Sequence, residues 1–312
     1  MYDIDGECGA CVNNRTKKLI DFKSRQEWLT KYLADNKGEY YDCVVAVSGG
    51  KDSHMIVRRL YENHGVKKAL LVSVTDEFTH TEAGKRNIDN LVKRYHCDHI
   101  TFRCDPQEFV RHTKEDFLCE LHPLKWVEGK IYRVPVEIAR TFVIPIVFFG
   151  ENSAFEYGND PDLCIFHPAS DAYTDIIFMG AIYPYSITDS LQQAREIGFI
   201  DLDDTGEWNR QGSLDQYTQI DSIAYIIQLW TKYVKFGFQR VADIASRRVR
   251  EGLIDRAEAI RLMEAEDWKC DPQAKADFCK TIGITFSEFE AAVAKHANLD
   301  LVEWREGAWK AK

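Results

Sequence analysis

Six consecutive residues combine the functional groups that bind phosphate. Residues 48–53 read Ser-Gly-Gly-Lys-Asp-Ser and directly follow the apolar run VVAV at 44–47. Gly49 and Gly50 predict a tight turn between a strand and a helix, whose backbone N–H groups close around an anion with support from the helix dipole. The two serine hydroxyls are further donors, and Lys51 adds a positive charge. We interpret this loop as a phosphate cradle.

Other phosphate-binding loops fit these residues less well. The P-loop of kinases and GTPases ends in Gly-Lys-Ser/Thr, whereas Lys51 is followed by Asp52. The loop also lacks the G-x-G-x-x-G of dinucleotide-binding folds. A strand-to-helix turn with a solvated lysine is the structural alternative. We favour the cradle because the complete run Ser-Gly-Gly-Lys-Asp-Ser after a strand is much more specific than its glycines and lysine alone.

The elements that position this loop belong to an α/β pattern. Apolar, β-branched runs alternate with helical periodicity between residues 42 and 150, which predicts a parallel sheet covered by helices. The predicted strands read DCVVAVS (42–48), ALLVSVT (69–75), DHITFR (98–103) and IPIVFFG (144–150). Ligands of such sheets bind beyond the carboxyl ends of the strands. The loops expected at that edge are 48–53, 75–84, the segment after 103, and 150–160.

The sequence changes to long helical stretches from about residue 216. Gly252 stands where a helix stop is expected, and Asp255 with Glu258 has capping-box spacing. Residues 201–215 resemble a linker. We expect an N-terminal Cys-containing segment and helix at 1–38, an α/β domain with the phosphate loop at 39–200, and a helical C-terminal domain at 201–312.

Composition argues against several classes of protein. The 312-residue chain has a net charge of −10 and a pI near 5.5, which argues against broad nucleic-acid binding. We find no signal-peptide pattern, and the longest apolar stretch, 141–150, is too short to span a bilayer, so we expect a cytoplasmic protein without membrane attachment. Nine cysteines without secretory features argue against a disulfide framework. Only Cys8 and Cys11 have metal-ligand spacing, as a partial zinc knuckle or as two ordinary thiols.

The loop resembles the PP-loop of the ATP pyrophosphatases, with matching positions at Ser48, Gly49, Gly50, Asp52 and Ser53. Three further stretches resemble the N-acetyl sugar amidotransferases of bacterial surface-polysaccharide pathways: YDIDGECGAC (2–11), GENSAFEYG (150–158) and YVKFGFQRVADIASRRVREGLIDRAEA (233–259). The resemblance runs over most of the chain, and its elements occur in the expected order. It implies a PP-loop domain with the adenine nucleotide alpha hydrolase-like fold, a parallel sheet with flanking helices.

The resemblance also implies an enzyme, an AMP-forming ligase. ATP would adenylate the oxygen of a sugar N-acetyl group, and ammonia would then displace AMP to leave an acetamidino group. Lys51 and Asp52 are the expected catalytic residues, and Mg²⁺ is expected near Asp52. The expected context is the biosynthesis of lipopolysaccharide O-antigen or of nonulosonic acids such as pseudaminic and legionaminic acid.

The same resemblance implies partners. Ammonia would come from a separate glutaminase subunit, often accompanied by a cyclase-like barrel subunit. The substrate would be an N-acetylated sugar that is either nucleotide-linked or a nonulosonic acid. Family members usually carry a further C-x-x-C pair, so Cys8 and Cys11 are candidate Zn²⁺ ligands by resemblance.

One candidate substrate-binding loop follows the fourth predicted strand. Its polar side chains would hydrogen-bond sugar or nucleotide hydroxyls, and the alternative is an ordinary loop with a capping asparagine. We favour the binding role because the PP-loop lies on the same predicted edge. The residues are Glu151, Asn152, Glu156 and Tyr157.

Further candidates lie on later elements. Thr75 and Asp76 end the second predicted strand, where they either contact adenosine or cap a helix. Lys235 and Arg240 either meet an anionic sugar or belong to a solvated helix face. His80 lies on a loop at the predicted binding edge, although a structural role is the favoured interpretation.

Two rival functions stay open. A tRNA-modifying PP-loop enzyme would use adenylation for thiolation, but the acidic balance of the chain argues against RNA binding. A scaffold that binds nucleotide only to organise a glutaminase complex is the non-enzymatic rival. The intact PP-loop pattern argues against this scaffold, because a scaffold has no need of catalytic groups.

Overall fold

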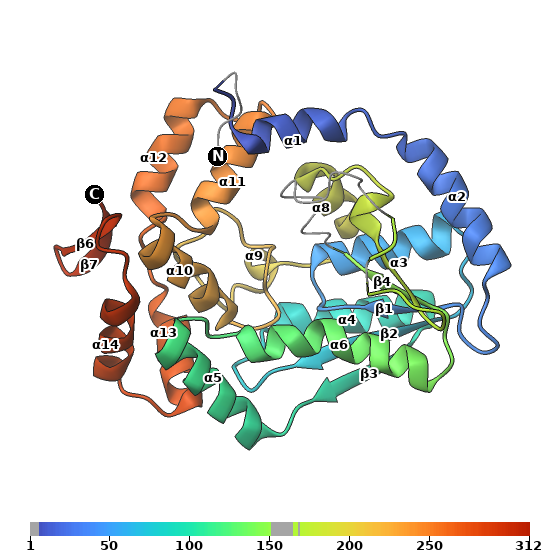
Figure 1. The fold of residues 1–312 in the computed structure, drawn as a ribbon, viewed down its shortest axis with the longest axis horizontal. Coiled ribbons are helices and arrows are strands. Elements are labelled where there is room, and N and C mark those ends of the chain that lie inside the picture. The colour runs from blue at the N-terminus through green and yellow to red at the C-terminus, as the bar shows by residue number, and fades with distance from the viewer. Residues whose placement is uncertain (1–5, 151–164, 168) are drawn as a thin grey trace. The chain divides into compact units, whose positions relative to one another are not determined.

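The computed structural model describes residues 6–150, 165–167 and 169–312. Its main sheet has five strands in the order β3-β2-β1-β4-β5, and β1 is parallel to β2 and β4, as β4 is to β5 (Figure 1). The strands are β1 (Cys43–Ala46), β2 (Ala69–Thr75), β3 (Asp98–Arg103), β4 (Ile146–Phe149) and β5 (Asp175–Phe178). The predicted parallel α/β sheet is confirmed. The sequence analysis missed β5.

The helices before and between the strands are α1 (Gly9–Lys17), α2 (Phe22–Asp35), α3 (Lys51–Asn63), α4 (Glu82–Tyr95), α5 (Pro106–Glu120) and α6 (Lys125–Thr141). After β5 come the 3₁₀ turn η1 (Met179–Ala181), α8 (Ile187–Glu196) and α9 (Leu202–Thr205). The C-terminal region contains α10 (Tyr225–Phe236), α11 (Arg240–Arg250), α12 (Arg256–Glu266), α13 (Pro272–Ile282) and α14 (Phe286–His296). No helix in the described part of the chain is both long and apolar enough to cross a membrane.

The chain forms two compact units. The first comprises Met1–Val74, Arg86–Phe102 and Ile131–Phe199, and the second comprises Thr75–Lys85, Arg103–Lys130 and Ile200–Lys312. The loop after β2 and helix α5 therefore group with the C-terminal helices rather than with the sheet. The predicted domain boundaries, which treat each domain as one continuous segment, stay a prediction.

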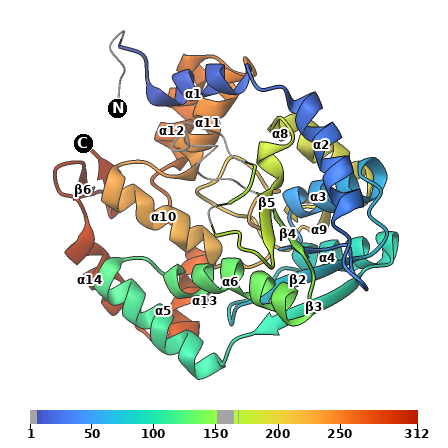
Figure 2. The ribbon, with the colours of Figure 1, turned by 45° about the vertical axis from the view of Figure 1, so that its right-hand side comes forward.

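The first unit buries both faces of its sheet. Successive residues of β1 point to opposite faces, so Val45 joins one apolar cluster and Val44 joins the other. The Val45 cluster includes side chains of α2, α3 and α4, among them Leu29, Leu60 and Leu91. The Val44 cluster includes side chains of α6, which lies on the other side of the sheet (Figure 2). This double coverage explains why the strands read as continuous apolar runs.

The second unit is mainly helical, as expected. Phe117 of α5, Phe278 of α13 and Phe289 of α14 form its aromatic centre, with ring centroids 4.9 Å apart for Phe117 and Phe278 and 5.0 Å apart for Phe117 and Phe289. Asp255 caps α12 by accepting the N–H of Glu258 at 2.7 Å, as its spacing predicted. The linker-like segment 201–215 is not an open linker.

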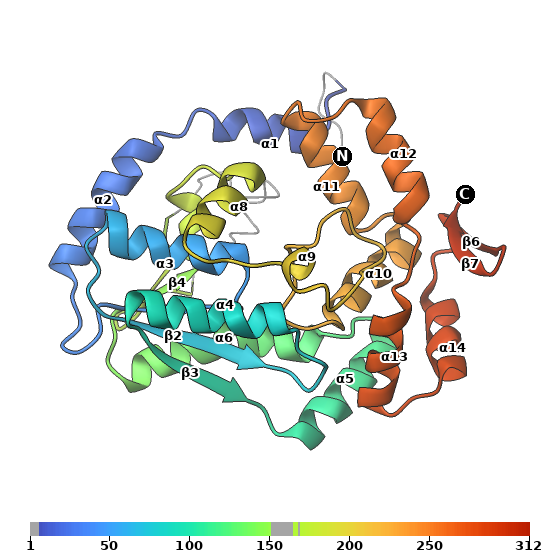
Figure 3. The same ribbon diagram turned by 180° about the vertical axis from the view of Figure 1, so that it is seen from behind.

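This unit differs from the sequence-based prediction in the linker-like segment and at the C-terminal end. Arg210 and Asp215 of the linker-like segment are buried, and the N–H of Gln211 donates to the carboxylate of Asp271 at 2.8 Å, which ties this segment to the start of α13. The chain also ends in an antiparallel hairpin of β6 (Val302–Arg305) and β7 (Ala308–Ala311), which the helical prediction missed (Figure 3). Positive φ angles at Glu306 (55°) and Gly307 (76°) form the tight turn that such a hairpin requires.

Candidate functional site

The predicted cradle is a strand, a glycine turn and a helix. Strand β1 ends at Ala46 and α3 begins at Lys51. Gly49 has φ of +82°, a conformation that glycine adopts without strain. Gly50 is the N-cap of α3, so the first amides of this helix have no capping side chain at that position. Such amides are the donors that bind an anion at a helix N-terminus.

The two serines of the loop contact each other through one hydrogen bond. The backbone N–H of Ser48 donates to the hydroxyl oxygen of Ser53 at 3.0 Å. Ser53 is buried, and its bond ties the end of β1 to the first turn of α3. The structure therefore supports a role for Ser53 in closing the loop. Its predicted contact with phosphate stays a prediction.

The ammonium of Lys51 contacts two side chains of the protein. Its ammonium donates to both oxygens of the Asp52 carboxylate, at 2.8 and 2.6 Å, and to the hydroxyl of Tyr185 at 2.9 Å. Only 2% of the Lys51 side chain is exposed. Burial lowers the pKa of Lys51, but Asp52 and Tyr185 outweigh this effect and raise the pKa above its ordinary value. The lysine is therefore a cation in this environment.

Sequence reasoning did not find Tyr185. It lies between η1 and α8, 134 residues away from Lys51, in a segment without a recognisable motif. About 40% of Tyr185 is exposed, so its hydroxyl contacts Lys51 while its ring faces solvent in part. This residue is a new member of the candidate site in the first unit.

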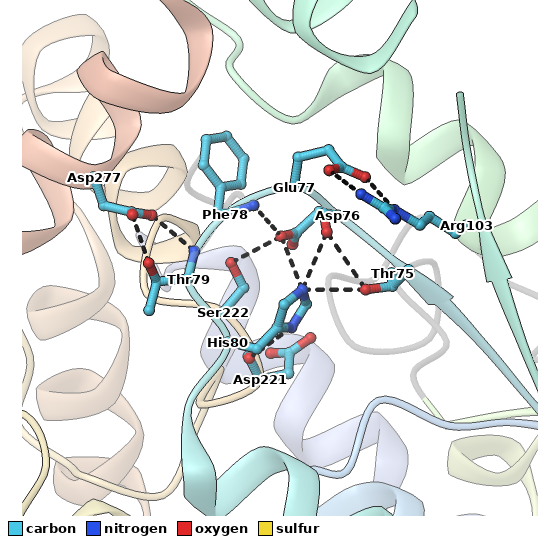
Figure 4. Close-up of polar contacts among 10 residues, drawn as sticks. All are labelled: Thr75, Asp76, Glu77, Phe78, Thr79, His80, Arg103, Asp221, Ser222 and Asp277. Atoms are coloured by element: carbon cyan, nitrogen blue, oxygen red, sulfur yellow. Dashed lines mark hydrogen bonds and ion pairs between the residues drawn. The ribbon is translucent and has the colours of Figure 1, made fainter. Parts of the chain in front are cut away.

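The loop after β2 is tied to a segment of the second unit that precedes α10. The carboxylate of Asp76 accepts the N–H of Phe78 at 2.9 Å and the hydroxyl of Ser222 at 3.3 Å (Figure 4). His80 and Ser222 also form an isolated antiparallel bridge. Because α4 begins only at Glu82, the alternative that Asp76 caps a helix is wrong. The carboxylate instead closes a turn within its own loop.

His80 lies at the centre of these contacts. Its Nδ1 is 3.2 Å from the carbonyl oxygen of Asp221, and its Nε2 is 3.1 Å from both the hydroxyl of Thr75 and the carbonyl oxygen of Asp76 (Figure 4). The Asp76 carboxylate is 3.4 Å from the same Nε2. These contacts support the structural interpretation of His80. The predicted contact of Thr75 and Asp76 with adenosine stays a prediction.

Two carboxylates in this cluster hold protons more tightly than usual. Burial raises the pKa of Asp76, with His80 acting in the opposite direction. Burial and the neighbouring Asp76 raise the pKa of Asp221 to about 6. The pKa of each of these two acids therefore lies above the ordinary carboxylate value.

The two predicted cations of the C-terminal region differ in their contacts. Lys235 donates to the carbonyl oxygen of Leu121 at 2.9 Å, directly after the end of α5. Burial, followed by the charge of Lys232, lowers the pKa of Lys235. Arg240 is the first residue of α11, and its buried Nε has no hydrogen-bond partner among the described residues. The unpaired Nε of Arg240 is a donor for an anionic ligand.

The remaining predicted residues fall into two groups. Cys8 is the N-cap of α1, and Cys11 lies in the first turn of that helix. Within the described ranges, no group of three or more His, Cys, Asp or Glu side chains is arranged to hold a metal, so a zinc site with Cys8 and Cys11 stays a prediction, as does Mg²⁺ at Asp52. The substrate candidates Glu151, Asn152, Glu156 and Tyr157 lie outside the described residues.

Comparison with known proteins adds a relationship for the last third of the chain. Residues 211–312 match the family model described as "LPS biosynthesis protein WbpG-like, C-terminal domain". This part of the chain is similar to that domain. It contains Asp221, Ser222, Lys235 and Arg240, together with α10 to α14 and the hairpin. No curated protein matches the chain.

Solved structures resemble the chain as a whole. One is the NMN synthetase from Francisella tularensis, with a TM-score of 0.39 and 12% identity, covering 86% of this chain and 96% of that chain. Another is the NH3-dependent NAD synthetase from Campylobacter jejuni subsp. jejuni NCTC 11168 in complex with the nitrate ion. Its TM-score is 0.37 at 12% identity, and the match covers 85% of this chain and 94% of that chain.

Proposed function

We propose that this protein is an ATP-dependent amidotransferase that converts the acetamido group of a sugar into an acetamidino group during lipopolysaccharide biosynthesis. The observation that carries this proposal is the loop of residues 48–53, in which amides without a capping side chain lie beside Lys51 and Asp52. The match of residues 211–312 to a WbpG-like domain supports the surface-polysaccharide context.

The proposed reaction proceeds in two steps. The amide oxygen of the substrate attacks the α-phosphorus of ATP, which forms an O-adenylyl imidate and releases pyrophosphate. Ammonia then attacks the imidate carbon, the bond from carbon to the adenylyl oxygen breaks, and AMP leaves. The acetamidino group remains on the sugar after loss of a proton. Activation is needed because an amide oxygen is a poor leaving group.

The loop residues have distinct roles in this proposal. The backbone amides at the start of α3 and the hydroxyl of Ser48 hold the departing pyrophosphate. Lys51 offsets the charge that grows on it, once its ammonium exchanges the Asp52 carboxylate for a phosphate oxygen. Asp52 would then be available to hold Mg²⁺, which would neutralise phosphate charge when bound. Lys51 and Asp52 must therefore separate during the catalytic cycle.

The proposal includes a substrate class and partners. We expect Arg240 to meet the anionic group of a nucleotide-linked sugar or a nonulosonic acid, because its Nε has no partner among the described residues. A separate glutaminase, with or without a cyclase-like barrel subunit, would supply ammonia. Ammonium salts would replace that partner in a purified system.

The test is turnover by the purified chain with ATP, Mg²⁺, ammonium and a panel of N-acetylated sugar nucleotides and nonulosonic acids. AMP and product mass are followed together. AMP formation with a mass decrease of about one dalton on one sugar, which replacement of oxygen by NH requires, would establish the reaction. AMP formed with tRNA but with no sugar would contradict the proposal and support the thiolation enzyme instead.

Two variants assign the activity to the proposed residues. Lys51→Ala should abolish AMP formation, because the positive charge that stabilises the departing pyrophosphate is lost. Arg240→Gln should raise the KM for the sugar at least tenfold with little change in the KM for ATP. Lys235→Gln is the matched control for Arg240, since its ammonium already binds the Leu121 carbonyl oxygen. Unchanged turnover in Lys51→Ala would remove the loop from the mechanism.

A further inference from the structure

A buried histidine contacts the loop from inside the first unit. His54 lies in the second turn of α3 and is 0% exposed. Its ring Nδ1 is 3.1 Å from the carbonyl oxygen of Gly50. A carbonyl oxygen only accepts hydrogen bonds, so the proton of the neutral ring is on Nδ1. The same carbonyl oxygen accepts the backbone N–H of His54 at 3.3 Å.

Besides this hydrogen bond, the ring of His54 has an aromatic neighbour and an unpaired nitrogen. The ring edge packs against Phe199, with centroids 5.3 Å apart and planes at 78°. Its Nε2 has no hydrogen-bond partner among the residues that the structure describes. A buried ring with one unpaired nitrogen lowers stability, because the desolvation of that nitrogen is not compensated. A leucine or phenylalanine would fill such a space without this loss, so the histidine needs another explanation.

Peptide geometry supplies the explanation. The carbonyl of Gly50 and the N–H of Lys51 belong to one planar peptide unit and point in opposite directions. A bond that holds the carbonyl therefore also sets the direction of the Lys51 N–H. This N–H is among the first amides of α3, which have no partner within the helix. It is one of the donors that the cradle offers to an anion.

The preceding glycines make this restraint necessary. Gly49 has φ of +82°, and Gly50 has no side chain that could bond to the helix N-terminus. Glycine explores more backbone conformations than any other residue, so the peptide between Gly50 and Lys51 rotates more easily than the later peptides of α3. The ring of His54 adds a second hydrogen bond to the single one that the helix provides.

We propose that His54 is a positioning residue of the phosphate cradle, whose Nδ1–H bond to the Gly50 carbonyl aims the Lys51 N–H at the pyrophosphate group of the nucleotide. This inference rests on the proposed function, in which residues 48–53 bind that group. It adds a role to a residue outside the loop. His54 itself does not touch the nucleotide.

Three substitutions separate the hydrogen bond from the packing of the ring. His54→Phe keeps an aromatic ring but loses the donor. His54→Asn keeps a donor, because the amide nitrogen of asparagine is as many bonds from Cα as Nδ1 is. His54→Gln places its amide nitrogen at the position of Nε2 instead, where it does not reach Gly50. The proposal therefore predicts that His54→Asn binds pyrophosphate more tightly than His54→Gln and His54→Phe do.

His64 offers a matched control at the C-cap of the same helix. It is also buried, at 6% exposed, and burial lowers the pKa of both His54 and His64 to about 4, so both rings are neutral at pH 7. Its ring nitrogens are 2.8 Å from the hydroxyls of Thr30 and Tyr183, away from the loop. His64→Phe thus replaces a comparable buried imidazole without touching the cradle.

The measurement is the affinity of each protein for pyrophosphate and for ATP with Mg²⁺ by titration calorimetry, which needs no sugar substrate. Urea unfolding of the same samples reports their stability. We expect His54→Phe and His54→Gln to weaken pyrophosphate binding at least tenfold, His54→Asn to stay within threefold of the parent protein, and His64→Phe to bind as the parent protein does. With the sugar present, kcat should fall more than the KM for the sugar changes.

Several outcomes would overturn the proposal. One is that His54→Phe binds pyrophosphate as the parent protein does. Another is that His54→Asn or His64→Phe loses as much pyrophosphate affinity as His54→Phe. A third is that the parent protein does not bind pyrophosphate. The proposed function fails independently, if pyrophosphate binding follows the expected order but no sugar supports AMP formation. The two failures are therefore distinguishable in one set of proteins.

Discussion

The ammonium of Lys51 and the carboxylate of its sequence neighbour Asp52 form an ion pair in which Nζ is 2.6 Å from Oδ2. The ammonium also contacts the hydroxyl of Tyr185. The two oxygens of one carboxylate lie too close together to accept from separate N–H groups, so they share one donor of the ammonium. Because only 2% of the Lys51 side chain is exposed, a phosphate can contact it only after a neighbouring group moves away.

The first prediction concerns the stability of this pair. Asp52→Asn should lower the free energy of unfolding by about 2 kcal/mol, because it leaves the buried ammonium of Lys51 without its counter-charge. Lys51→Met combined with Asp52→Asn should recover part of this loss, since the double variant has no buried cation. Urea unfolding of the parent protein, both single variants and the double variant measures the coupling. Additive effects would contradict it.

The second prediction concerns Tyr185. Tyr185→Phe should destabilise the nucleotide-free protein by about 1 kcal/mol, because one donor of Lys51 loses its acceptor. ATP with Mg²⁺ should raise the melting temperature of this variant more than that of the parent protein, since a phosphate oxygen replaces the missing hydroxyl. Tyr173→Phe is the control, because Tyr173 is 82% exposed. An ATP-induced shift equal to that of the parent protein would count against this role.

The third prediction compares the two glycines of the loop. Gly49→Ala should cost about 1–2 kcal/mol of stability, because φ of +82° is strained for a residue with a Cβ. Gly50 has φ of −74°, and a Cβ there would meet the Ser48 hydroxyl at 3.5 Å, an ordinary contact. Gly50→Ala should therefore cost less. Thermal unfolding ranks the two variants, and the reverse order would refute the assignment of strain to Gly49.

The fourth prediction concerns pH. The pKa of Asp221 is raised to about 6, so the folded state binds this proton more tightly than the unfolded state does. The carboxyl's contribution to stability is therefore greatest at low pH and is lost as the pH rises from about 4 to about 6. Asp221→Asn stays neutral and should gain about 2 kcal/mol over the parent protein at pH 8, but little at pH 4.

The measurement for Asp221 is urea unfolding across this pH range. Asp300→Asn is the control, because Asp300 is exposed. It should show no comparable gain at pH 8. A gain for Asp221→Asn that is the same at pH 4 and at pH 8 would show that its cause is not the titration of this carboxyl.

Local sequence determined the central elements of this protein. The run 44–53 predicted β1, its glycine turn and the start of α3, because apolar β-branched residues, glycines and a following helical pattern each act within a few neighbouring residues. The parallel sheet and the helical C-terminal region followed from the same short-range patterns. The cap at Asp255 did so as well, since capping joins residues within one helical turn.

Tertiary structure alone decided which side chains meet. Tyr185 contacts Lys51, which lies 134 residues away in the sequence, and His80 contacts Asp221, which lies 141 residues away. Sequence periodicity carries no information about pairs that are so far apart along the chain. Burial also depended on the tertiary structure. The sequence predicted that the charge of Lys51 is available to phosphate, whereas in the fold Lys51 is buried and paired with Asp52. Spacing along the chain specifies local backbone conformation, but the partners of a polar side chain depend on the path of the whole chain, because hydrogen bonds and desolvation act between neighbours in space.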